Sequence, residues 1–273
     1  MNDRVRNSFQ LQVTLKPMIA LGASQPFAWQ AVATARGRSF SAAAAALPPE
    51  QRISLEACRI TLAMERAVAA GLLQSDALLA IPIGAAGGKS GALLSHLFRT
   101  ALAHRFPVAR LVVEVSADER GDRDCAASLI EACMARGLSV ALDAFAAGPV
   151  ALSLLARFTP RFVKLDPALV RRIDASASRR PIVEGVMRLA RGMGVAVVAT
   201  GVATRGELEA LAALGLCHVQ GEWIAEPVVR ALTNPGLLRR EPRATVPQHR
   251  RLAHHSRASL PLRATYQAAQ LAL

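Results

Sequence analysis

Short apolar runs recur between residues 111 and 220 of the chain, and each run ends in one polar residue. The four polar residues are Glu114, Asp143, Lys164 and Gln220. Between the runs, apolar residues recur at helical spacing, so the pattern predicts strands that alternate with helices. Such alternation is typical of a largely parallel sheet. In a (β/α)8 barrel the functional side chains stand at the C-terminal strand ends, so the four residues predict a site at one mouth of a barrel.

The number of strand and helix units favours a closed barrel over an open sheet. Predicted strands cover residues 9–19, 26–34, 78–83, 110–115, 138–143, 162–165, 195–199 and 217–220. Predicted helices cover residues 54–71, 90–106, 123–136, 149–157, 181–191 and 205–214. Ser54 is expected to cap the first of these helices, and Thr204 with Glu207 has the pattern of a capping box at the last. Residues 36–49 show no clear period.

The chain divides into three segments. Residues 1–8 form an N-terminal tail, residues 9–229 form the barrel domain, and residues 230–273 form a second tail. The second tail is rich in Arg, His and Pro, and Glu241 is its only acidic residue. A segment of this composition buries too little apolar surface to fold alone, so we expect a mostly disordered basic tail.

The composition suits one large α/β domain. Of the 273 residues, 52% are hydrophobic and only 4% are aromatic, so we expect a core of Ala, Leu and Val. The net charge of +13 permits binding to nucleic acid, anionic lipid or an acidic partner without selecting one of them. The four cysteines form no CxxC pair, which favours a reducing compartment. No apolar stretch is long enough to span a membrane and residues 1–7 lack a signal core, so we expect a cytoplasmic protein.

Five motifs follow one another in the order and spacing of a known family. LVVEVSADE is similar to the family pattern LExTE, LDAFAAG to DDFGxG, and FVKLDPALV to KID. VATGVAT is similar to AEGVE, and HVQGEW is similar to QGY. Residues 9–229 therefore resemble an EAL domain, the bacterial phosphodiesterase module for cyclic di-GMP. The resemblance implies a modified (β/α)8 barrel and a role in bacterial signal transduction.

The resemblance also implies a two-metal site. In the family, strand-end carboxylates and an Asn hold two Mg²⁺ or Mn²⁺ ions, which activate water to attack a phosphodiester in line, with help from a lysine. Glu114 and Asp143 stand at metal-binding positions of the family, and Lys164 stands at the position of its catalytic lysine. Gln220 stands at the Gln of QGY and is a candidate ligand-binding residue.

Other family positions have lost the side chain that the motif carries there. They are Gln30 (Glu in EAL), Pro82 (Asn), Ala144 (Asp in DDFG), Thr200 and Ala203 (Glu in AEGVE), Lys16 (Gln in QPI) and Thr34 (Arg after EAL). Loss of one supporting partner typically lowers metal affinity or activity about 10–100-fold, and here several ligands are replaced together. We therefore expect a vestigial Lys164, no hydrolysis and no cofactor, or at most one weakly bound Mg²⁺, Mn²⁺ or Ca²⁺ ion.

A purely structural role is the alternative for the retained residues. Glu114, Asp143 and Lys164 could form a buried ion-pair cluster, which persists without catalysis because removal of one partner is costly. Gln220 could serve only to hydrogen-bond the loop beside Gly221. The sequence alone does not decide between these structural roles and a role in ligand binding.

A further motif is weaker. GAAGGKSG, residues 84–91, resembles a phosphate-binding P-loop, but its spacing is one residue short of the pattern GxxxxGK followed by Ser or Thr. The cradle of backbone N–H groups depends on the loop length, so we interpret the segment as a flexible loop between a strand and a helix.

Three functional hypotheses follow. The first is a degenerate, inactive EAL domain protein that acts through an unknown protein partner or as a cyclic di-GMP sensor, and we favour the protein partner. The second is an active or weakly active metal-dependent cyclic di-GMP phosphodiesterase. The third is a basic adaptor that binds nucleic acid or anionic membrane through its tail, where Tyr266 is the only aromatic residue available for base stacking. A second copy of the chain is another candidate partner.

Overall fold

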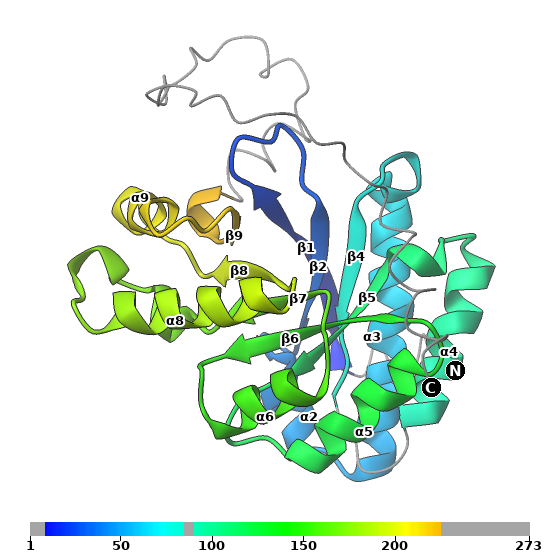
Figure 1. Ribbon diagram of the computed structural model, residues 1–273. Coiled ribbons are helices and arrows are strands. Elements are labelled where there is room, and N and C mark those ends of the chain that lie inside the picture. Colours follow the sequence, from blue (N-terminus) through cyan, green and yellow to red (C-terminus); the bar gives the residue numbers. More distant parts are fainter. Residues whose placement is uncertain (1–8, 85–89, 225–273) are drawn as a thin grey trace, which may run out of the picture. The chain divides into compact units, whose positions relative to one another are not determined.

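The structure is a computed structural model that describes residues 9–84 and 90–224 (Figure 1). The N-terminal tail of residues 1–8, most of the P-loop-like segment and the basic tail of residues 230–273 lie outside the described residues. The domain boundaries at residues 8 and 229 therefore remain predictions.

Eight of the described strands close into a barrel. The strands are β1 (Leu11–Ala20), β2 (Ala28–Ala35), β3 (Arg38–Ser39), β4 (Leu78–Pro82), β5 (Leu111–Ser116), β6 (Ser139–Phe145), β7 (Phe162–Leu165), β8 (Ala196–Thr200) and β9 (His218–Gln220). Their order is β1–β9–β8–β7–β6–β5–β4–β2, with β3 beside β2, and pairing of β1 with β2 closes the ring. Strand β1 is antiparallel to both of its neighbours, whereas the other neighbours in the ring are parallel. The predicted modified barrel is confirmed.

Helices follow the strands, and the six predicted helices occur in the predicted order, together with short helices at residues 40–45 and 167–170 that the sequence does not predict. They are α2 (Phe40–Ala45), α3 (Pro49–Ala69), α4 (Ser90–Ala103), α5 (Arg123–Met134), α6 (Pro149–Arg157), α7 (Pro167–Val170), α8 (Arg179–Gly192) and α9 (Arg205–Ala213). Helix α3 packs against β1 and β4, α5 packs against β5 and β6, and α8 packs against β8 (Figure 1). None of the described helices combines the length and apolar character needed to cross a membrane.

The predicted start of the long helix is wrong. Helix α3 begins at Pro49, so Ser54 lies inside the helix and does not cap it. Proline is pre-organised for the first helical position, and the Ser54 hydroxyl donates a hydrogen bond to Glu50 O one turn earlier. The patternless residues 36–49 contain β3 and the six-residue helix α2, which Ser39 caps. A helix this short shows too few turns to reveal its period in a sequence.

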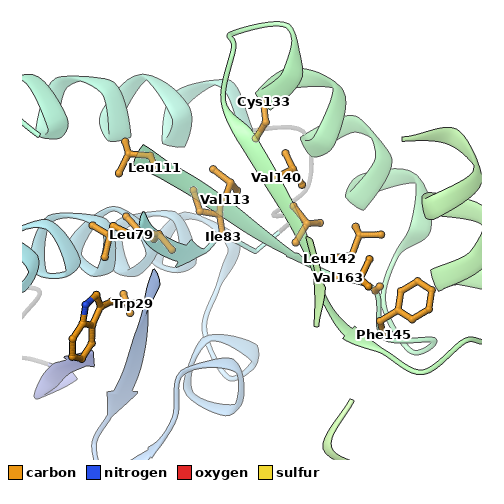
Figure 2. Close-up of a cluster of buried hydrophobic side chains, with 14 of the residues drawn as sticks. Trp29, Leu79, Ile83, Leu111, Val113, Cys133, Val140, Leu142, Phe145 and Val163 are labelled. Carbon is orange, nitrogen blue, oxygen red and sulfur yellow. The ribbon is translucent and has the colours of Figure 1, made fainter. Parts of the chain in front are cut away.

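Side chains alternate between two apolar cores along the strands of the ring. The core inside the barrel contains Met18, Ala28, Leu78, Ala80, Val112, Ala141, Phe162 and Val198. The larger core lies between strands and helices, and Figure 2 shows part of it, including Leu79, Leu111, Val113 and Leu142. Ala, Leu and Val supply most of both cores, as the composition predicts. The same alternation decides which polar residues point into the barrel.

A buried carboxylate fastens the loop after β8 to the segment after α7. Glu207, which is 3% exposed, forms the predicted capping box with Thr204. Its Oε1 also accepts a hydrogen bond from Arg172 N at 2.8 Å, and its Oε2 accepts one from Ala203 N at 2.8 Å. Burial alone raises the pKa of Glu207, but these backbone donors outweigh burial and hold the pKa below its ordinary value.

Replacement of Glu207 by Gln is expected to lower the free energy of unfolding by about 1–2 kcal/mol at neutral pH, because the amide has one acceptor oxygen instead of two. Folding lowers the pKa of Glu207. The carboxylate therefore contributes fully to stability above its pKa in the unfolded chain, about 4.3, and this contribution is lost as the pH falls through its lower pKa in the folded protein. Urea unfolding of the wild type and of Glu207→Gln at pH values from about 7 down to 3 measures the difference in their free energies of unfolding. This difference should shrink on acidification, and a difference that does not depend on pH would contradict this account.

Candidate functional site

Each strand of the ring contributes one residue to a mouth layer above the interior core, although the strands do not all pair at these residues: Gln30 is opposite Ala80, and Glu114 is opposite Ala141. Because side chains alternate, the residue two positions beyond an interior residue also points inward. On β1, which runs the opposite way, the equivalent residue lies two positions before Met18. The layer consists of Lys16, Gln30, Pro82, Glu114, Asp143, Lys164, Thr200 and Gln220. The structure therefore brings the four strand-end residues together at one mouth, with four neighbours.

Glu114 is the centre of this mouth. Glu114 and Lys164 are each 1% exposed, whereas the Asp143 side chain is 33% exposed. Lys164 Nζ lies 2.9 Å from Glu114 Oε1 and 3.2 Å from Asp143 Oδ1. Glu114 Oε1 makes no hydrogen bond of good geometry, so its contact with Lys164 is an ion pair alone. On the other side, Gln30 Nε2 donates a hydrogen bond to Glu114 Oε2 at 2.6 Å. One ammonium group thus serves two carboxylates.

Burial and charge shift the pKa values of this pair. Burial is the largest influence on Glu114 and raises its pKa; Lys164 opposes the rise and Asp143 adds to it. Burial lowers the pKa of Lys164, but the two carboxylates outweigh burial, so the pKa of Lys164 lies above the ordinary value of a lysine. Lys164 is therefore an ammonium group at neutral pH and has no lone pair with which to accept a proton.

The end of strand β6 is irregular where it carries Asp143. The pairing of β6 with β7 shifts register between Leu142 and Phe145, and Ala144 has a φ of 55°. Left-handed backbone costs residues with a Cβ roughly 1–2 kcal/mol, and Asp or Asn tolerates it better than Ala. The shift bends the strand end away from the flat ladder, as β-bulges near functional sites do.

Glu119 fastens the loop that follows this strand end. Its carboxylate accepts hydrogen bonds from Val150 N at 3.1 Å and from Ala151 N at 3.2 Å, at the start of α6. Gly148 precedes α6, and a Cβ there would lie 2.5 Å from Glu119 Oε1, so glycine is required while Glu119 is in place. Because Glu119 lies beyond β5, this cap ties two loops of the mouth together.

Gln220 faces a cavity of about 470 Å³ at the mouth, which Lys16, Lys164 and Arg171 also line. Gln220 is 5% exposed, and its Nε2 has no hydrogen-bond partner among the described residues. Its backbone O accepts a hydrogen bond from Val202 N at 3.1 Å. The backbone of Gln220 thus serves the loop beside Gly221, while its side-chain amide is available to a ligand. Gln30 and Asp143 also line an adjoining cavity of about 760 Å³.

The sequence does not predict a second buried ion pair that borders the mouth. Glu56 and Arg59 on α3 are each 5% exposed, and Arg59 donates to Glu56. The Arg59 guanidinium carbon lies 3.9 Å from the centre of the Phe40 ring, and Gly84 N donates to Glu56 Oε1 at 3.3 Å. The pair therefore links α3, α2 and the end of β4. The available signal was an opposite-charge pair three residues apart within the apolar stripe of a helix.

The sequence matches the family described as EAL domain over residues 4–227. The chain belongs to the EAL domain family. The resemblance that the motifs indicate is thereby confirmed.

Named relatives and solved structures agree with this family. The chain is 31% identical to the blue light- and temperature-regulated antirepressor BluF of Escherichia coli over 134 residues, which are 49% of this chain and 33% of BluF. A standalone versatile EAL protein of Vibrio cholerae, solved in a cyclic di-GMP bound form, has a TM-score of 0.70 at 23% identity and covers 80% of this chain and 92% of its own. The BlrP1 protein of Klebsiella pneumoniae, solved with manganese and cyclic di-GMP, has a TM-score of 0.68 at 27% identity and covers 78% of this chain and 54% of its own. The chain thus spans about a third of the length of BluF.

The donors at the mouth of this EAL domain do not fit two divalent metal ions. Within residues 9–84 and 90–224, no group of three or more His, Cys, Asp or Glu side chains could hold a metal ion. Pro82 and Ala144 bring no side-chain ligand, and the Thr200 hydroxyl donates to a backbone carbonyl at 2.6 Å. Ala203 contributes only its backbone N–H, which is bonded to Glu207. Hard divalent cations require several oxygen ligands, and the inward-pointing strand-end residues of this mouth supply two carboxylates that already share one lysine.

Replacement of Glu119 by Ala is expected to lower the free energy of unfolding by about 1 kcal/mol, because the first N–H groups of α6 lose their acceptor. Urea unfolding measures this loss, with Glu184→Ala as the matched control, since Glu184 is an exposed glutamate on α8. The control should change stability by less than about 0.5 kcal/mol. Equal effects of the two substitutions would contradict a capping role for Glu119.

Proposed function

We propose that this EAL domain protein acts in cyclic di-GMP signalling by binding and does not hydrolyse the nucleotide. Its partner is another protein or cyclic di-GMP itself, and we favour a protein. Both kinds of function occur among its relatives: BluF bears the name of an antirepressor, and the Vibrio and Klebsiella structures contain cyclic di-GMP. The chain shares the EAL domain with them and has its own chemistry at the mouth.

One observation carries the proposal, namely that the inward-pointing strand ends of the described barrel bring only two carboxylates, Glu114 and Asp143, and that these share a single lysine. Two-metal hydrolysis requires a cluster of anionic ligands that neutralises both cations and holds the attacking water between them. With Lys164 included, the charges of this cluster sum to about −1, far from the balance that two divalent cations need.

The cavity at the mouth supports a binding role. Lys16 and Arg171 bring positive charge to its wall, and Gln220 brings an amide donor that has no partner among the described residues. The family motif has Gln at the position of Lys16 and Arg at that of Thr34, so contacts that the motif implies for the nucleotide have changed. This change is the reason for preferring a protein partner over cyclic di-GMP.

Calorimetric titration of the full chain with cyclic di-GMP in the presence of Ca²⁺ separates a protein-interaction module from a sensor. We expect no sub-micromolar binding, that is, no binding free energy beyond about −8 kcal/mol. Sub-micromolar affinity would contradict a purely protein-binding role. If such binding occurs through the mouth, Gln220→Ala should weaken it at least about tenfold, because the variant lacks a buried donor.

Incubation of the protein with cyclic di-GMP and Mg²⁺ or Mn²⁺ tests hydrolysis. We expect no linear dinucleotide above the protein-free control by liquid chromatography, because the mouth lacks the ligands for two cations. The matched variant is Glu114→Gln, which keeps the shape of the side chain and removes its charge. A rate in the wild type that Glu114→Gln abolishes would contradict the proposal.

A further inference from the structure

Both oxygens of Glu114 face donors that the protein itself supplies. Gln30 Nε2 lies 2.6 Å from Oε2, and Lys164 Nζ lies 2.9 Å from Oε1. A buried carboxylate without such partners would carry a large desolvation cost. The Gln30 amide and the Lys164 ammonium group therefore stabilise the buried carboxylate of Glu114, as bound cations would otherwise do.

These donors occupy the space in which a metal ion would bind. Ca²⁺ needs oxygen ligands at about 2.3–2.6 Å and Mg²⁺ at about 2.0–2.1 Å, so neither ion fits between Gln30 Nε2 and Glu114 Oε2. A cation that bridged Glu114 and Asp143 would have to compete with Lys164, whose Nζ lies within 3.2 Å of both carboxylates.

Positive charge also approaches Glu114 from the helix side. Arg59 is buried beside the mouth, and the charge of Glu114 contributes to keeping Arg59 ionised. Arg59 is itself paired with Glu56, which offsets much of its charge toward an incoming cation. Lys164 is thus the cation that acts on Glu114 directly, through their ion pair.

We propose that Gln30 and Lys164 replace metal ions on Glu114, so that this mouth excludes divalent cations, and that Gln30 decides the exclusion. The inference rests on the proposed function and adds the physical means by which hydrolysis is lost. In Gln30→Glu, the donor that now satisfies Glu114 becomes a second carboxylate at hydrogen-bond distance. Two such groups need a proton or a cation between them, so this one substitution should open the mouth to a metal ion.

Thermal unfolding of the full chain with about 10 mM Mn²⁺ or Ca²⁺, against a chelator, tests the proposal, because a ligand that binds the folded state raises its melting temperature. The wild type should shift by less than about 1 °C, and Gln30→Glu should rise by about 5 °C or more. The matched control is Gln30→Met, which removes the donor without adding charge and should not respond. Lys164→Met, which leaves Glu114 and Asp143 without their ammonium group, should also gain a response.

A wild-type shift as large as that of Gln30→Glu would overturn the proposal, as would equal shifts in Gln30→Glu and Gln30→Met. If Gln30→Glu does not fold in chelator, recovery of a cooperative transition with Mn²⁺ supports the proposal. Absence of that recovery, together with no response of Lys164→Met, overturns it. If the wild type binds Mn²⁺ but does not hydrolyse cyclic di-GMP, the proposal of metal exclusion is refuted and the proposed function stands. If the wild type hydrolyses cyclic di-GMP, the proposed function is refuted.

Discussion

The ion pair between Glu114 and Lys164 is the interaction on which the barrel mouth depends. Both residues are 1% exposed, so neither charge is solvated by bulk water. Removal of one partner from such a pair typically costs about 3–5 kcal/mol, because the other charge stays buried and unpaired. The neighbours follow this constraint: Gln30 donates to the second oxygen of Glu114, and Asp143 shares the lysine from the more exposed side.

The alternation of side chains along each strand determines both which residues fill the barrel and which residues lie at its mouth. Interior positions such as Ala28, Val112 and Phe162 fill the barrel, and the next interior positions along the same strands are Gln30, Glu114 and Lys164. The polar layer is therefore held by the same close packing that stabilises the fold. Its loops are fastened separately, by Glu119 at the start of α6 and by Glu207 below the loop after β8.

The sequence predicts the features that depend on local period. Short apolar runs that end in Glu114, Asp143, Lys164 and Gln220 indicate the barrel and half of its mouth layer. The sequence does not predict that Lys16 lies opposite Gln30, because register depends on pairing between segments that are distant in the chain. It also misses the caps made across loops, since those contacts join segments that no period relates. The pair of Glu56 with Arg59 lies within one helix, but its burial depends on contacts with Phe40 and with Gly84, which come from other parts of the chain.

The central claim is that Lys164 is a fixed internal cation of the mouth. Lys16, Lys89 and Lys164 are the only lysines of the chain, so nitrogen NMR of the side-chain ammonium groups can resolve Lys164. Because the carboxylates raise its pKa, Lys164 Nζ should still be protonated at a pH of about 10.4, where ordinary lysines are half titrated. Its signal should also be unchanged by about 10 mM Mg²⁺, since the ion cannot displace it. Loss of the Lys164 proton at a lower pH than ordinary lysines, or a shift of its signal with Mg²⁺, would contradict the account.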